Sequence, residues 1–184
     1  MKMRDILPRQ NILSELRGTS MREVLEELAG LVVARYPEVG KDRLVEVLLE
    51  REKRGSTAIG EGIAIPHGKV PRLPGVVAAF GRSRCGVDFQ SLDGGPTQLV
   101  VLLAAPEDAA DASGALHLQA LARVSRLLRS PEFRRRLLDA EGALNIYEVI
   151  REGDEKYVKL PAVCGAKSFV RAEVALGEHR RAVG

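Results

Sequence analysis

His67 is the residue of this chain best placed to do chemistry. It follows a glycine-rich segment at residues 55–62, a short apolar stretch at residues 63–65 and a proline. An imidazole with a pKa of about 6.5 is largely neutral near pH 7 and keeps a lone pair on one ring nitrogen. Phosphoryl transfer asks a protein mainly for positioning and charge stabilisation. We therefore interpret His67 as a nucleophile that receives a phosphoryl group and passes it on.

The residues that precede this histidine are typical of a phosphate cradle. Gly60 and Gly62 allow backbone N–H groups to approach an anion without a Cβ in the way. Ser56 and Thr57 carry hydroxyls that can donate to the same oxygens, and the guanidinium of Arg51 can bind two phosphate oxygens at once. We expect these five residues to surround the phosphoryl group.

The other two histidines are His117 and His179. Spacing alone favours a structural helix histidine at His117, and the alternative is a second imidazole that donates to the phosphoryl oxygens. His179 lies in a polar terminal segment and is expected to be solvated. A metal site at His67 and His117 lacks a clear third ligand, and the glycine-rich segment matches neither the dinucleotide fingerprint nor the Walker loop. We predict neither a metal nor a cofactor.

Helices and strands alternate along the chain. Ser20 and Glu23 form a capping box that starts a helix ended at Tyr36, and Asp42 is expected to cap a second helix that ends near residues 51–54. Further helices are expected at 116–128, from Ser130 and at 143–150. Strands are expected at 12–16, 63–65, 76–80 and 98–103, and 87–89 is a further candidate. The mixture predicts a layered α/β or α+β domain.

Composition narrows the possible partners. The net charge is +3, and residues 155–184 carry six Lys or Arg and three Glu, so residues 1–154 are neutral overall. Aromatic residues make up only 4% of the chain, too few for a base-stacking surface. We therefore predict no nucleic-acid partner. The sequence has no secretory signal, no long apolar span and two widely separated cysteines, so we expect a cytoplasmic protein without direct membrane insertion.

Residues 51–68 read REKRGSTAIGEGIAIPHG. This string resembles the enzyme IIA domain of the fructose and mannitol class of the bacterial phosphoenolpyruvate-dependent phosphotransferase system, and within that class the nitrogen-regulatory type. The likeness runs over about residues 5–152, and Leu116-His117-Leu118 matches the second histidine of the family. The resemblance implies a mixed β-sheet with helices on both faces.

The resemblance also implies roles for single residues. His67 would be phosphorylated through Nε2, His117 would help to hold the phosphoryl group, and Arg51 would belong to the same site. The implied donor is a histidine-containing phosphocarrier protein, and phosphorylation in nitrogen-regulatory members controls regulators and transporters. Residues 153–184 form an extension past the usual end of the domain, without a motif.

Two alternatives to a regulatory phosphocarrier stay open. A free-standing sugar-specific enzyme IIA would pass the phosphoryl group to a cysteine of an enzyme IIB partner. The other alternative is a binding module that keeps the fold but does not transfer a phosphoryl group. The presence of Arg51, His67 and His117 argues against it.

Overall fold

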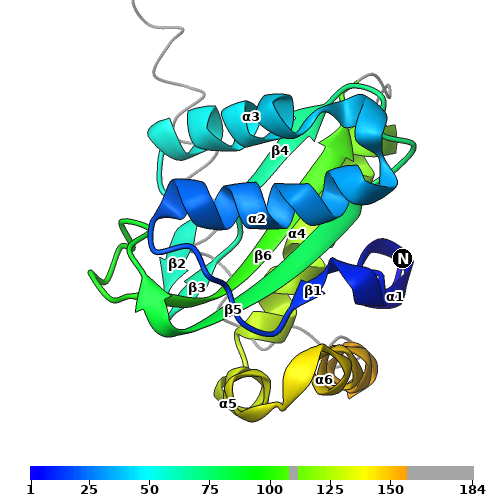
Figure 1. Cartoon of the computed structure of the whole chain (residues 1–184). Coiled ribbons are helices and arrows are strands. Elements are labelled where there is room, and N and C mark those ends of the chain that lie inside the picture. Colours follow the sequence, from blue (N-terminus) through cyan, green and yellow to red (C-terminus); the bar gives the residue numbers. More distant parts are fainter. Residues whose placement is uncertain (108–111, 157–184) are drawn as a thin grey trace, which may run out of the picture.

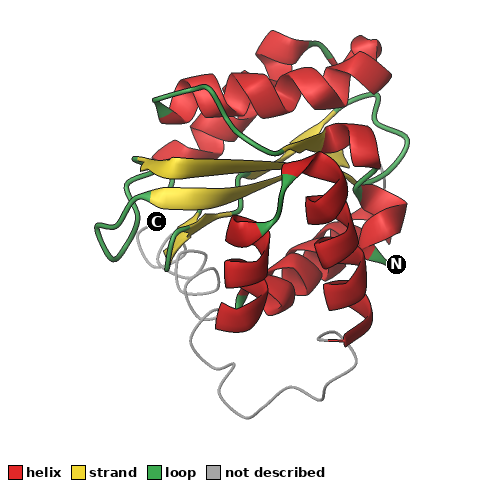
Figure 2. Cartoon of the chain, turned by 60° about the horizontal axis from the view of Figure 1, so that its bottom comes forward, coloured by secondary structure: helices red, strands yellow, loops and turns green. Residues whose placement is uncertain are grey.

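A computed structural model describes residues 1–107 and 112–156 as three layers. A six-stranded sheet lies between two helical layers, with α2 and α3 on one face and α1, α4, α5 and α6 on the other (Figures 1 and 2). The expected mixed sheet with helices on both faces is therefore confirmed.

The sheet has the order β1-β5-β6-β3-β2, and β4 also pairs with β6. Strand β1 runs parallel to β5, and β3 and β4 run parallel to β6, whereas β5 runs antiparallel to β6 and β2 antiparallel to β3. The strands are β1 (Ile12–Leu13), β2 (Ala58–Gly60), β3 (Ile63–Ala64), β4 (His67–Val70), β5 (Val77–Val87) and β6 (Thr97–Pro106).

Strand β6 is central and buried on both faces, which is why its sequence is an almost unbroken apolar run. Leu99, Val101 and Leu103 face one hydrophobic core, and Val100 and Leu102 face the other. The first core packs against α4, α5 and α6, and the second against α2 and α3. Each helical layer is thus fastened to the sheet by its own core.

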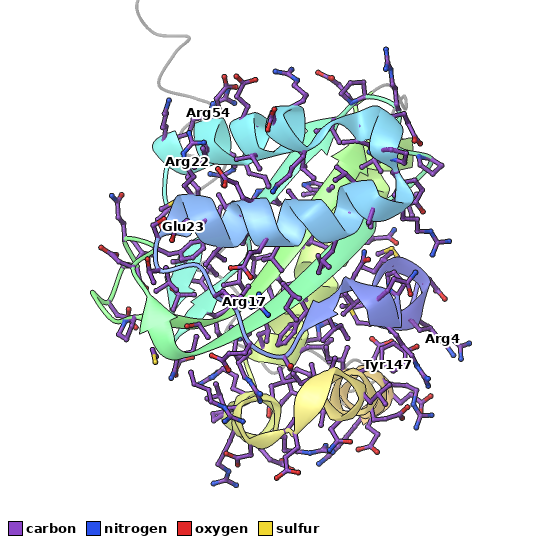
Figure 3. All side chains as sticks on the ribbon, in the orientation of Figure 1. Arg4, Arg17, Arg22, Glu23, Arg54 and Tyr147 are labelled. Carbon is purple, nitrogen blue, oxygen red and sulfur yellow. The ribbon has the colours of Figure 1, made fainter. Side chains whose placement is uncertain are left out.

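The first layer consists of α2 (Met21–Arg35) and α3 (Lys41–Lys53), with a short 3-10 helix, Pro37–Val39, between them. Ser20 and Glu23 form the expected capping box on α2. The predicted cap of α3 was wrong, because Gly40 with φ +75° occupies that position and Asp42 lies inside the first turn. Figure 3 shows Arg54, at the end of α3, on the same side of the molecule as Glu23 at the start of α2.

The second layer contains α1 (Met3–Ile6), α4 (Ala112–Leu128), α5 (Pro131–Asp139) and α6 (Gly142–Lys156), and a 3-10 turn at Arg9–Asn11 precedes β1. Ser130 caps α5 as expected. The helical spacing of leucines in residues 116–128 includes Leu118, but this residue is 58% exposed and the neighbouring His117 is buried instead. Helix α6 continues through residues 153–156, where Gly153 packs on the ring of Phe133.

Other sequence expectations differ from the structure. The strand expected at residues 63–65 ends at Ala64, and after Ile65 and Pro66 a new strand, β4, begins at His67. Residues 87–89 were expected as a separate strand, but Val87 is the last residue of β5. Of the two cysteines, Cys85 is exposed and Cys164 lies outside the described residues, as does His179.

Over residues 1–107 and 112–156, no helix is both long enough and apolar enough to cross a membrane.

Gly68 sets the separation between α3 and β4. A Cβ at this position would lie 2.6 Å from Cγ1 of Val47 on α3. We expect Gly68→Ala to destabilise the protein by about 1–3 kcal/mol, since the helix must move or Val47 must leave its rotamer. Chemical denaturation measures the change in free energy of unfolding.

The matched control is Gly30→Ala in α2, where the added methyl group would meet nothing among the described residues within 4 Å other than its chain neighbours and the helix's own backbone. This variant should be about 0.5–1 kcal/mol more stable than wild type, because alanine is the better helix former. Equal effects of the two substitutions would contradict the packing argument.

Candidate functional site

His67 lies at an interruption in the sheet. Strands β3 and β4 pair with successive parts of β6, and Ile65 and Pro66 separate them. The break leaves the Ile65 carbonyl within 2.8 Å of His67 Nδ1. Because a carbonyl can only accept, Nδ1 carries the proton and donates it. The neutral ring therefore keeps its lone pair on Nε2.

The register of β4 decides which way its side chains point. His67 pairs with Leu103 and Gly68 with Ala104 in the parallel β4–β6 ladder. Leu103 belongs to the core under α4, and Ala104 belongs to the core under α2 and α3. Residues in register on neighbouring strands share a face, so His67 is directed toward α4 and Gly68 toward α3. The contact of Gly68 with Val47 agrees with this assignment.

Arg51 reaches His67 from the other layer. It lies in the last turn of α3, and its Nε lies 3.2 Å from His67 Nε2, to which it donates. Its Nη1 donates to the Gly55 carbonyl at 3.1 Å. The guanidinium is therefore held at the lone pair that a phosphoryl group would use.

His117 approaches from α4. The centroids of its ring and the His67 ring are 5.6 Å apart, and the planes are inclined by 50°. The residue is only 8% exposed. Burial, together with the electrostatic influence of His67 and Lys69, lowers its pKa from 6.5 to about 4. Its Nδ1 is buried without a hydrogen-bond partner among the described residues. At neutral pH this imidazole is uncharged and can donate one N–H.

Lys69 is a member of the site that sequence reasoning missed. It stands two residues after His67 on β4 and so shares its face, and its positive charge acts on His117. Side chains alternate between the two faces of a strand, so a strand predicted at residues 67–70 would have placed Lys69 on the same face as His67.

The two predicted hydroxyl ligands have protein acceptors. Ser56 Oγ donates to the Phe89 carbonyl at 2.8 Å, and Thr57 Oγ1 donates to the carboxylate of Glu52. A hydroxyl has one hydrogen to donate, so neither is directed at His67 in this structure.

The two predicted glycines lie at the other end of β3. Gly62 precedes Ile63, which pairs with Leu99, whereas His67 pairs with Leu103. Four residues of β6 separate these levels, roughly 13 Å at about 3.3 Å per residue. Gly60 instead lies against Asp93, which accepts the Glu61 N–H at 2.7 Å.

The structure thus brings together Arg51, His67 and His117, and adds Lys69. Within residues 1–107 and 112–156, no cluster of three or more His, Cys, Asp or Glu could hold a metal ion. A nucleophilic nitrogen faces a fixed cation beside a neutral imidazole donor, which is an arrangement suited to binding a phosphoryl group covalently.

A family model described as "Phosphoenolpyruvate-dependent sugar phosphotransferase system, EIIA 2" matches residues 5–153. The chain belongs to this family. A nitrogen regulatory protein of Bradyrhizobium diazoefficiens is 43% identical over 150 residues, which are 82% of this chain and 95% of the relative. The fructose-specific EIIABC component of Bacillus subtilis is 37% identical over 155 residues, which are 84% of this chain and 24% of the relative.

A solved EIIA structure has the same architecture. The nitrogen regulatory protein IIA-Ntr of Neisseria meningitidis matches with a TM-score of 0.72 and 30% identity, and the match covers 79% of this chain and 97% of the relative. The resemblance seen in the sequence is therefore confirmed at the level of the EIIA family.

The lowered pKa of His117 links stability to pH. The unfolded chain binds a proton on this residue below pH 6.5, whereas the folded chain binds it only near pH 4. Stability therefore falls as pH drops through this window. We expect a loss of about 1–2 kcal/mol between pH 7 and pH 5, because residual solvent contact weakens the full effect.

Denaturation of wild type and His117→Leu at both pH values measures this loss. The difference between the proteins cancels the titration of all other groups, and the variant should lose less stability on acidification. Parallel pH profiles would exclude a depressed His117 pKa.

Proposed function

We propose that this EIIA chain is a phosphocarrier whose acceptor is Nε2 of His67. The observation that carries the proposal is the hydrogen bond from Nδ1 to the Ile65 carbonyl, which leaves the lone pair on Nε2 beside Arg51. The donor is a histidine-containing phosphocarrier protein with an N-phosphorylated imidazole. The N–P bond of the donor breaks as the new N–P bond to Nε2 forms, and no electrons are gained or lost.

The site's own groups suit the product of this step. Phosphorylated His67 carries a proton on Nδ1 and a formal positive charge on the ring, and the Ile65 carbonyl accepts from that N–H. The Arg51 donor that now faces Nε2 turns to the phosphoryl oxygens. Neutral His117 adds one N–H donor to the phosphoryl oxygens.

We propose that phosphorylation serves regulation in this chain. The support is the similarity to a nitrogen regulatory protein over 95% of that protein's length. A phosphoryl group adds about −1.5 to −2 charges to the rim of the site, which is enough to change a protein interface. Regulators or transporter components would be the partners, in the cytoplasm, and residues 5–152 would form the carrier domain with residues 153–184 as an extension of unknown role.

A second candidate is a sugar-specific EIIA that passes the phosphoryl group to an enzyme IIB. The similarity to a fructose-specific EIIABC component favours it. Transfer to a purified fructose-class IIB protein separates the two candidates. Rapid loss of label to the IIB cysteine supports transport, and a label that stays on His67 supports regulation.

Incubation with phosphoenolpyruvate and the purified general phosphotransferase proteins tests the acceptor. We expect intact mass to show one acid-labile phosphoryl group on wild type and none on His67→Ala. His117→Ala should be labelled about 10–100 times more slowly, because one donor to the phosphoryl oxygens is lost.

Equal labelling of wild type and His67→Ala would refute the assigned acceptor. An unlabelled wild type, with a control acceptor labelled in parallel, would favour the binding module without phosphotransfer.

Arg51→Lys tests the guanidinium separately. Lysine keeps the charge but cannot hold the Gly55 carbonyl and a phosphoryl oxygen in one rigid fork. We expect the labelling rate to fall about tenfold or more, with the unfolding free energy within about 0.5 kcal/mol of wild type. A labelling rate like that of wild type would show that charge alone is sufficient.

A further inference from the structure

Thr57 lies between the two groups that hold the His67 imidazole. On one side, its N–H donates to Glu52 Oε2 at 2.9 Å and its hydroxyl donates to Oε1 of the same carboxylate. On the other side, its carbonyl accepts the Ile65 N–H at 3.1 Å. Thr57 is only 5% exposed, so these bonds are shielded from water.

The two partners of Thr57 lead directly to His67. Glu52 is the chain neighbour of Arg51, which donates to His67 Nε2, and the carbonyl of Ile65 accepts from His67 Nδ1. Hydrogen bonds and chain connections therefore close a ring from Arg51 through Glu52, Thr57 and Ile65 to His67 and back to Arg51.

The loop itself is also fixed to α3. The Gly55 N–H donates to the Glu52 carbonyl at 3.0 Å, while Arg51 Nη1 donates to the Gly55 carbonyl. Ser56 Oγ accepts the Ala58 N–H at 3.1 Å and donates to the Phe89 carbonyl. Gly55 has φ +152°, a conformation that L side chains rarely adopt, and it turns the chain back toward Glu52.

We propose that Thr57 and Glu52 are positioning residues for phosphoryl transfer, which act through Arg51 and Ile65 rather than on the phosphoryl group. This inference rests on the proposed function. It gives the Gly-Ser-Thr segment a role other than the phosphate contact expected from its sequence. The carboxylate of Glu52 is a double acceptor that holds the end of α3 against the loop, and so keeps the guanidinium at Nε2.

Thr57→Val removes the hydroxyl and keeps the shape of the side chain. We expect the maximal rate of phosphoryl acceptance to fall about tenfold with an unchanged KM for the donor protein, because the nucleophile and cation lose alignment. Thr57→Ser keeps the hydroxyl and should stay within about threefold of wild type.

The matched control is Thr97→Val. Thr97 is fully buried, and its hydroxyl has no hydrogen-bond partner among the described residues. The same chemical change there should leave the transfer rate unaltered. A loss of rate in both variants would indicate a general effect of the substitution on folding.

A double-mutant cycle distinguishes positioning from a separate structural contribution. If Thr57 acts through Arg51, Thr57→Val should slow the Arg51→Ala protein by less than twofold. A full tenfold further loss would overturn this part of the proposal.

Nitrogen NMR of the unphosphorylated protein supplies a readout that does not depend on transfer. We expect Thr57→Val to shift the Arg51 Nε–H resonance and to raise the share of the His67 tautomer protonated at Nε2. Unchanged resonances together with a wild-type rate would refute the positioning role while leaving the phosphocarrier proposal intact. An unlabelled wild type would refute the phosphocarrier, and the NMR comparison would still test the hydrogen-bonded ring.

Discussion

The organisation of this protein depends on the hydrogen bond between His67 Nδ1 and the Ile65 carbonyl. It fixes both the orientation of the ring and the tautomer, and so determines which nitrogen is nucleophilic. The bond requires a carbonyl that the sheet does not use. Pro66 contributes no N–H and separates β3 from β4, and the interruption presents Ile65 to the imidazole.

The second constraint is the position of β4 at an edge. It pairs with β6, whereas β6 also pairs with β5 and is covered by helices on both faces. At this edge the two helical layers come within reach of one ring, so α3 can supply a cation and α4 a neutral imidazole. A residue in the middle of β6 could meet only one layer.

Burial determines the protonation state of the second histidine at the site. His117 is kept neutral because its environment penalises the protonated form, whereas the guanidinium of Arg51 supplies the positive charge at Nε2 of His67. Away from the site, the guanidinium of Arg82 is buried and donates to carbonyls at the end of α5, including those of Leu137 and Ala140. That helix carries Arg134, which pairs with Glu61 of the glycine-rich segment. The loop is therefore fixed by α5 as well as by α3.

The sequence alone determined the capping box of α2, the apolar run of β6 and the break at Pro66. It also supplied His67 as a nucleophile and Arg51 as a cation suited to phosphate. The tertiary structure decided which of the predicted site residues meet. Ser56 and Thr57 were expected to face a phosphate because hydroxyls beside glycines suit one, yet the fold supplies Phe89 and Glu52 as acceptors. The place of Lys69 in the site depends on strand register, and the burial of His117 depends on helix packing. Neither follows from local spacing, because both rest on contacts between residues far apart in the chain.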